Sequence, residues 1–245
     1  MFAFGCSFEG LFRPEYFYDV QCADTLHVHL SFHSSLKPQP SRVGQTSCLL
    51  TNGNGLLISH EDGRHLQIWS NEVTPANLIY PDLLKAVQMA TESQSDALLH
   101  GVAFSYLGHT CLILGDRNVG KSSVLARMTS DSRFRVISDD LVRIVDSRVI
   151  LGSPFICIRD PIRLSRSPDA THFSRIRIVF LLRRGNPRKS RVLESRNLEF
   201  EIRRASIAPL KHTNGFSGAS FAAIFGNDPK DAFSSIQRFL CMFDA

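Results

Sequence analysis

One stretch decides the fold of this chain: Gly115-Asp116-Arg117-Asn118-Val119-Gly120-Lys121-Ser122. It follows the apolar run Cys111–Leu114 and is followed by a helix-like segment, so it predicts a strand, a glycine-rich loop and a helix. Gly115 and Gly120 allow a tight turn that brings several backbone N–H groups around one phosphate, at the positive end of the helix dipole. The pattern is that of a phosphate-binding P-loop, to which the following Ser123 is added as a binding residue.

The last residues of the loop predict that the bound phosphate is part of a nucleotide. Lys121 would reach the β- and γ-phosphates of a nucleotide, and Ser122 would place its hydroxyl on the accompanying Mg²⁺. We therefore expect a nucleotide and Mg²⁺ as ligands. An ordinary strand-to-helix turn is the alternative interpretation of the same stretch.

Two acidic residues at the end of a later strand extend this prediction. A P-loop needs a further carboxylate at the end of a neighbouring strand, to hold Mg²⁺ or to orient a nucleophile. Asp139 and Asp140 follow the strand-like run Arg135–Ser138 directly. Adjacent carboxylates repel one another and lose hydration on burial, so a cation or a proton-transfer task explains them, although paired aspartates also occur as helix caps.

The sequence pattern changes near residue 95. Before it, short strands and turns predict a small β-rich domain over residues 1–95, and after it alternating buried strands and helices predict an α/β domain over residues 96–245. The strands expected in the first part span residues 26–30, 55–59 and 65–69, with a turn at 52–55 and a helix from residue 81. In the second part we expect strands at 98–107, 110–114, 135–138 and 176–182, and helices at 121–128 and from residue 229 to the end.

Composition narrows the class of protein. The chain has 245 residues, is 43% hydrophobic, and has six cysteines without a C-x-x-C pair, which predicts a packed protein of a reducing compartment. It has no apolar run of membrane-spanning length and no basic signal-peptide start, so we expect a cytoplasmic protein that does not enter a membrane. The net charge of +5 comes largely from arginines between Arg159 and Arg204. They form either an electropositive rim for phosphate or a solvated face, and no nucleic-acid-binding motif accompanies them.

Three motifs together resemble a known family. His100-Gly101, the P-loop, and Ile137-Ser138-Asp139-Asp140 resemble the nucleotide-binding domain of HPr kinase/phosphorylase and its smaller stand-alone relatives, some of which are associated with modification of ribosomally made peptides such as lasso peptides. In that family a His-Gly or His-Ala pair precedes the P-loop lysine by 21 residues, as His100 precedes Lys121 here. The match covers roughly residues 98–144.

The resemblance implies roles for particular residues. Lys121 looks like the phosphate-contacting lysine, Ser122 like the Mg²⁺ ligand, and Asp140 like the general base that takes the proton of a substrate hydroxyl. Asp139 would lie beside the metal and His100 would order the carboxylates. The implied cofactors are ATP and Mg²⁺, the implied acceptor is a serine of a peptide or protein, and the implied assembly is a homo-oligomer.

One departure from the family pattern and one competing resemblance keep alternatives open. The family carries a further metal-binding glutamate, and the nearest segment here, Ile156–Asp160, offers only Asp160 as a stand-in. A catalytically inactive nucleotide-binding regulatory module is therefore the main alternative. The loop also resembles that of Era-type GTPases, but no Asp-x-x-Gly or Asn-Lys-x-Asp motif follows Lys121.

Taken together, these motifs predict an α/β protein with a P-loop, HPr-kinase-like domain and a smaller N-terminal β-rich domain. We expect an ATP-dependent serine kinase that transfers the γ-phosphoryl group to a hydroxyl.

The loop itself also departs from the family pattern. The family's small Ser-Gly pair within the loop is Arg117-Asn118 here, and asparagine tolerates a left-handed backbone better than most residues.

Overall fold

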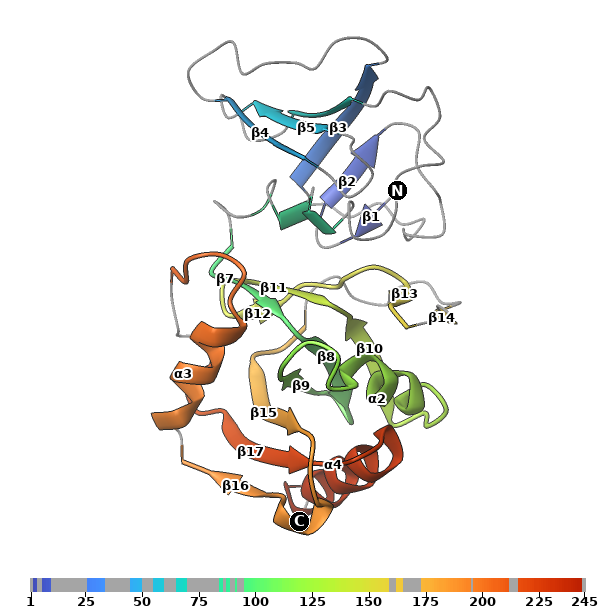
Figure 1. Ribbon diagram of the computed structural model, residues 1–245, viewed down its shortest axis with the longest axis vertical. Helices are drawn as coiled ribbons and strands as arrows, with labels where there is room; N and C mark the ends of the chain where they lie inside the picture. The colour runs from blue at the N-terminus through green and yellow to red at the C-terminus, as the bar shows by residue number, and fades with distance from the viewer. Residues whose placement is uncertain are drawn as a thin grey trace. The chain divides into compact units, whose positions relative to one another are not determined.

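The computed structural model divides the chain into two compact units (Figure 1). One comprises residues 1–94 and 166–169, and the other residues 95–165 and 170–245. The structure describes residues 2–3, 6–9, 26–33, 45–49, 55–59, 65–69, 84–85, 87–88, 91, 95–158, 162–164, 173–194, 196–211 and 216–243.

The first unit is built on a mixed sheet with the strand order β1-β2-β3-β6-β5-β4. Its strands are β1 (Phe2–Ala3), β2 (Cys6–Glu9), β3 (Leu26–His33), β4 (Gln45–Leu49), β5 (Gly55–Ser59) and β6 (His65–Trp69). The strands β4, β5 and β6 pair antiparallel in sequence order, so the turn predicted at residues 52–55 falls between two paired strands. The three strands expected from sequence in this part are thus present as β3, β5 and β6.

The second unit holds a six-stranded sheet with the order β10-β8-β9-β15-β17-β16. These strands are β8 (Val102–Tyr106), β9 (His109–Leu114), β10 (Phe134–Ser138), β15 (Ile176–Arg183), β16 (Arg191–Leu193) and β17 (Ser220–Phe225). The run at residues 176–182 is interior to the sheet because β15 pairs in parallel with both β9 and β17. The side chains of β15 are buried except at Arg177 and Arg183.

Strand direction brings distant parts of the sequence to one edge of this sheet. β8 pairs antiparallel with β9 and also with β10, so β9 and β10 run in the same direction with β8 between them. The carboxyl ends of β9, β10, β15 and β17 therefore share one edge, and β8 begins there. Ligands of open α/β sheets bind outside this carboxyl edge.

The strand expected over residues 98–107 is broken at Gly101, which corrects the prediction. Residues Ala97–His100 form β7, which pairs with β11 (Leu141–Val145) in a separate sheet of order β12-β11-β7. β12 is Arg148–Val149, and a further small pair joins β13 (Phe155–Ile156) to β14 (Ile162–Arg163). A Cβ at Gly101 would lie 3.0 Å from the carbonyl oxygen of Ile113, so the chain passes β9 too closely for a larger residue.

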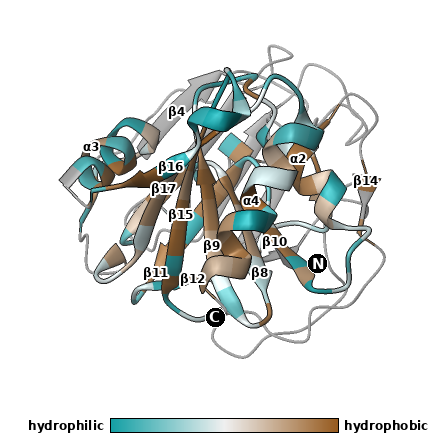
Figure 2. Ribbon diagram, turned by 90° about the horizontal axis from the view of Figure 1, so that it is seen from below, coloured by the Kyte–Doolittle hydropathy of each residue, from teal (hydrophilic) through white to brown (hydrophobic). Residues whose placement is uncertain are grey.

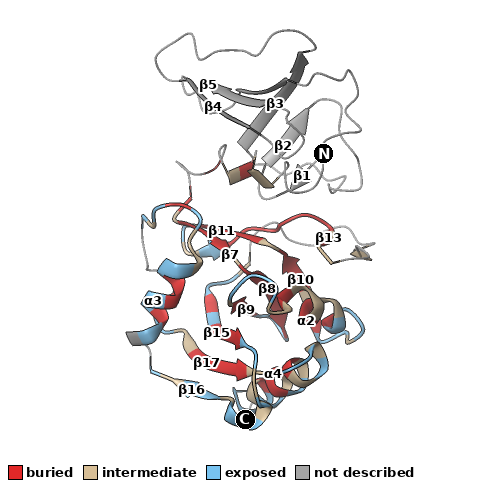
Figure 3. Cartoon of the chain, viewed as in Figure 1, coloured by how far each residue is buried: buried red, intermediate tan, exposed pale blue. Residues whose placement is uncertain are grey.

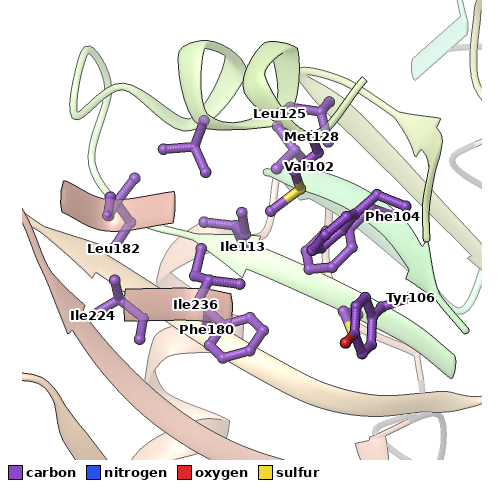
Figure 4. Packing of buried hydrophobic residues seen from close by; sticks show 14 of the residues in the cluster. Val102, Phe104, Tyr106, Ile113, Leu125, Met128, Phe180, Leu182, Ile224 and Ile236 are labelled. Atoms are coloured by element: carbon purple, nitrogen blue, oxygen red, sulfur yellow. The ribbon is translucent and has the colours of Figure 1, made fainter. Parts of the chain in front are cut away.

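Helices cover both faces of the main sheet. α2 (Lys121–Met128) and α4 (Pro229–Phe243) enclose one apolar cluster, in which Leu125 and Ile236 are fully buried against strand residues such as Phe180 (Figure 4). α3 (Arg196–Ala205) closes a second cluster on the other face through Leu198 and Ile202. A short 3-10 turn, η4 (Pro187–Lys189), connects β15 to β16. The strands are apolar and the outward helix faces are polar, as Figure 2 shows.

The C-terminal helix begins where its sequence predicts. Asp228 Oδ1 accepts hydrogen bonds from the backbone N–H groups of Lys230 and Asp231, which caps α4 ahead of Pro229. The last turn of α4 is exposed, since Phe243 is 45% exposed whereas Leu240 is buried. None of the helices in the described part of the chain has the length and apolarity that crossing a membrane requires.

Candidate functional site

The loop between β9 and α2 has the backbone that its glycines predict. Gly115 has φ +151°, and a Cβ there would lie 2.5 Å from the carbonyl oxygen of Leu182 on the neighbouring strand β15. Gly120 precedes α2 with φ +100°. Asn118 takes a left-handed backbone with φ +60°, which is the tolerance expected of asparagine at this place. Asp116, Arg117 and Asn118 are exposed at the tip of the loop, while Val119 is half-buried.

Lys121 is the first residue of α2 and its ammonium group points back into the loop. Its Nζ donates to the carbonyl oxygens of Gly115 and Asp116, each at 3.0 Å, and lies 3.2 Å from His100 Nε2. Burial lowers the pKa of Lys121 from its ordinary value, against the opposing attraction of nearby carboxylates. The three ammonium protons thus have partners at the place where a P-loop binds phosphate.

Ser122 and Asp139 meet although 17 residues separate them. Ser122 Oγ donates to Asp139 Oδ1 at 2.8 Å, and the backbone N–H of Cys157 donates to Asp139 Oδ2 at 2.6 Å. Asp139 is 1% exposed, and this burial raises its pKa to about 6, against the opposing effect of the two hydrogen bonds. A buried carboxylate facing a serine hydroxyl has the donor chemistry that Mg²⁺ prefers.

Asp140 lies in a conformation that few residues adopt. Its φ is +66°, and the backbone N–H of Leu141 donates to the carbonyl oxygen of Asp139 at 2.8 Å, which closes a three-residue turn around Asp140. The Asp140 carbonyl accepts from the N–H of Gly101 at 3.3 Å. The side chain is 33% exposed, and its Oδ1 lies 3.1 Å from His100 Nδ1. Backbone strain of this kind is concentrated at functional sites, so it favours a task for Asp140.

His100 links the two charged groups of the site. Because the Lys121 ammonium can only donate, His100 Nε2 accepts, and the ring proton then belongs on Nδ1, which faces Asp140. Lys121, His100 and Asp140 therefore form one hydrogen-bonded chain. It runs from the P-loop to the turn that contains Asp139 and Asp140, which we call the acidic turn. The side chain of His100 is half-buried at the end of β7, at the same sheet edge as the loop.

A cavity of about 330 Å³ adjoins this chain of residues. His100 and the loop residues Gly115–Arg117 line one side, and the end of β15 and residues 204–207 line the other. The walls carry two ion pairs, Arg183 with Glu201 and Arg204 with Asp116. The cavity is large enough for a side chain or a small molecule to approach His100 and the loop together.

The structure brings the predicted site residues together but adds others that the sequence did not single out. Ser123 is half-buried in the first turn of α2, next to Ser122. Arg184 donates to the carbonyl oxygen of Asn118, so arginines contact the loop from outside. Membership of the arginine-rich stretch was the only signal for Arg184 and Arg204. Nothing in the sequence indicated that the Cys157 backbone would bind Asp139.

The metal-binding part of the site is sparse. In the stretches of chain that the structure describes, no three or more His, Cys, Asp or Glu side chains cluster to hold a metal ion. An ion between Ser122 and Asp139 would take its remaining ligands from water and phosphate oxygens, which is how Mg²⁺ is usually bound beside nucleotides. Asp160, the stand-in for the family glutamate, lies outside the described residues.

Comparison with known proteins gives a distant likeness. No family model and no curated protein matches the sequence. Among solved structures, the HPr(Ser) kinase/phosphatase from Coxiella burnetii is similar with 12% sequence identity and a TM-score of 0.38, over 60% of this chain and 99% of that chain. A TM-score this low does not show membership of a family. The resemblance named from the three motifs therefore stays a prediction.

Proposed function

We propose that the protein is an ATP-dependent kinase that transfers the γ-phosphoryl group to a hydroxyl, with a serine of a peptide or protein as acceptor. One observation carries this proposal: the Lys121–His100–Asp140 chain joins the predicted phosphate site to a partly exposed carboxylate, and His100 at its centre lines a cavity. Phosphoryl transfer needs positioning, charge neutralisation and a group that orients the nucleophile. Groups suited to these tasks lie at one edge of the sheet.

In this proposal the loop binds the nucleotide. Backbone N–H groups of the loop and the N-terminus of α2 surround the phosphates, and Lys121 exchanges its bonds to loop carbonyls for bonds to phosphate oxygens. Ser122 and Asp139 would hold Mg²⁺, which neutralises phosphate charge when bound. Asp139 is suited to this task because its buried carboxylate gains from a nearby cation.

Asp140 takes the acceptor proton in the same proposal. Its carboxylate is partly exposed, and His100, which lines the cavity, holds it through Nδ1. An acceptor hydroxyl that reaches Asp140 would therefore meet a carboxylate that His100 holds in place. General-base catalysis requires this proximity, with the proton within hydrogen-bonding reach.

The test separates binding from transfer. Isothermal titration with ATP and Mg²⁺, and mass spectrometry of a serine-containing peptide library incubated with both, are compared for the wild type, Lys121→Ala and Asp140→Asn. We expect Lys121→Ala to lose ATP binding. Asp140→Asn should bind ATP as the wild type does and lose transfer by about a hundredfold or more. Asparagine also tolerates φ near +60°, so the turn is preserved.

Other outcomes would change the proposed function. Equal loss of ATP binding in both variants would remove Asp140 from the role of base. Tight ATP binding by the wild type without transfer to any acceptor would favour the regulatory module. A preference for GTP would favour a GTPase.

A further inference from the structure

Arg204 reaches the P-loop from a helix that lies far along the sequence. Its Nη2 pairs with Asp116 Oδ1 at 2.5 Å, across 88 residues. Lys121 binds the carbonyl oxygen of the same loop residue at 3.0 Å. Two cations therefore meet at Asp116, Lys121 from inside the loop and Arg204 from outside it.

The surroundings of Arg204 leave it able to bind a phosphate. Its side chain is half-exposed and lines the cavity that His100 also lines. Its second carboxylate partner, Glu201, lies 4.0 Å away and is held more closely by Arg183, at 2.8 Å. A guanidinium group has five donors, and one exposed ion pair does not use them all.

The negative charge of Asp116 requires a nearby cation if phosphate is to bind to this loop. The Asp116 side chain is 68% exposed at the second position of the predicted phosphate-binding loop. A carboxylate there would repel a γ-phosphate that came close to it, unless a cation faced both groups. Exposed ion pairs are weak, so a phosphate group can draw Arg204 away from Asp116 or share it.

We propose that Arg204 contacts the γ-phosphate of the bound nucleotide and so makes the site prefer a triphosphate over a diphosphate. This inference rests on the proposed function, since it requires nucleotide in the loop. The γ-phosphate is the relevant group because Arg204 lines the same cavity as His100, and His100 contacts the proposed base, Asp140. An arginine binds phosphate through paired N–H donors and stabilises the charge that spreads over the transferred group.

The experiment compares two neighbouring arginines of α3. The affinities for ADP and for the non-hydrolysable triphosphate AMP-PNP are measured with Mg²⁺ by isothermal titration, for the wild type, Arg204→Ala and Arg203→Ala. Arg203 is the matched control because it is exposed on the same helix, pairs with Glu199 and does not line the cavity. We expect Arg204→Ala to weaken AMP-PNP binding about tenfold with unchanged ADP binding, and Arg203→Ala to change neither.

Repeating the comparison in the Asp116→Asn protein separates two roles of Arg204: contact with the phosphate and neutralisation of the Asp116 charge. If Arg204 touches the γ-phosphate, its removal still weakens AMP-PNP binding in the Asp116→Asn protein. Unchanged AMP-PNP affinity in Arg204→Ala, an equal loss of ADP binding, or rescue by Asp116→Asn would each overturn the proposal.

These outcomes are distinct from failure of the kinase proposal. A protein that binds AMP-PNP through Arg204 but transfers nothing to any acceptor keeps the inference and loses the kinase function. A protein that transfers phosphate to an acceptor, but whose triphosphate affinity is unchanged in Arg204→Ala, keeps the kinase function and loses the inference. Absence of nucleotide binding by the wild type would overturn both.

Discussion

Gly152 packs against the residue that precedes the acidic turn. It lies against Ser138, the residue before Asp139, and its N–H donates to the carbonyl oxygen of Ile137 at 2.9 Å. A Cβ at this position would collide with Ser138 Oγ, lie 2.8 Å from Ser138 Cβ and lie 3.0 Å from its Cα. Ser138 is buried and its hydroxyl donates to the carbonyl oxygen of Leu141 at 2.6 Å, so it has no room to move.

We therefore predict that Gly152→Ala destabilises the protein by about 3 kcal/mol, the upper range for overpacking a dense interior. Urea unfolding measures the change. Gly108→Ala is the control, because Gly108 has φ +87° and a Cβ there would meet no atom within 4 Å beyond its chain neighbours. It should cost about 1 kcal/mol from the left-handed backbone alone. Equal losses in the two variants would contradict the packing argument.

At the scale of the elements, α4 depends on its cap. Two backbone N–H groups donate to Asp228, and these bonds, the one from Asp231 foremost, hold its pKa below the ordinary value of 3.8. A carboxyl group with a depressed folded-state pKa stabilises the fold above its unfolded pKa, and this stability is lost as the pH falls through the folded value. The cap matters because α4 and α2, which carries Lys121, share one apolar cluster.

We predict that Asp228→Ala melts a few degrees below the wild type at pH 7 and that the difference shrinks as the pH falls below 3.8. Thermal unfolding followed by circular dichroism measures both. Asp228→Asn should keep most of the stability at pH 7, since its amide oxygen accepts the same bonds. A melting difference between wild type and Asp228→Ala that stays constant down to acidic pH would show that the carboxylate charge is not involved.

At the scale of the molecule, the candidate site belongs to one unit. His100, the loop, the acidic turn and the arginines around the cavity all lie within residues 95–245, and the buried strands of that unit form its own core (Figure 3).

We predict that a fragment of residues 95–245 folds alone and binds ATP with the affinity of the full chain, as expected of a domain with its own core. Circular dichroism tests folding and isothermal titration tests binding. A fragment of residues 1–94 should bind no nucleotide. A folded 95–245 fragment that has lost ATP binding would show that the first unit contributes to the site.

Sequence alone predicted the elements whose signals are local. The strand, loop and helix around Gly115–Ser122 follow from an apolar run, two glycines and a helical segment, and α4 begins at residue 229 as its sequence predicts. The resemblance alone implied that His100 would lie near the carboxylates, and the contact between His100 and Lys121 was not predicted. Spacing along a chain does not state which strands share an edge.

Tertiary structure decided what joins these elements. The opposite direction of β8 puts the ends of β9 and β10 at one edge, and the close approach at Gly101 divides a run whose pattern predicts one strand. Arg204 and the Cys157 N–H reach the site across 88 and 18 residues. Local pattern fixes backbone conformation within a few residues, whereas such contacts depend on how the helices and sheet pack, which no short stretch of sequence contains.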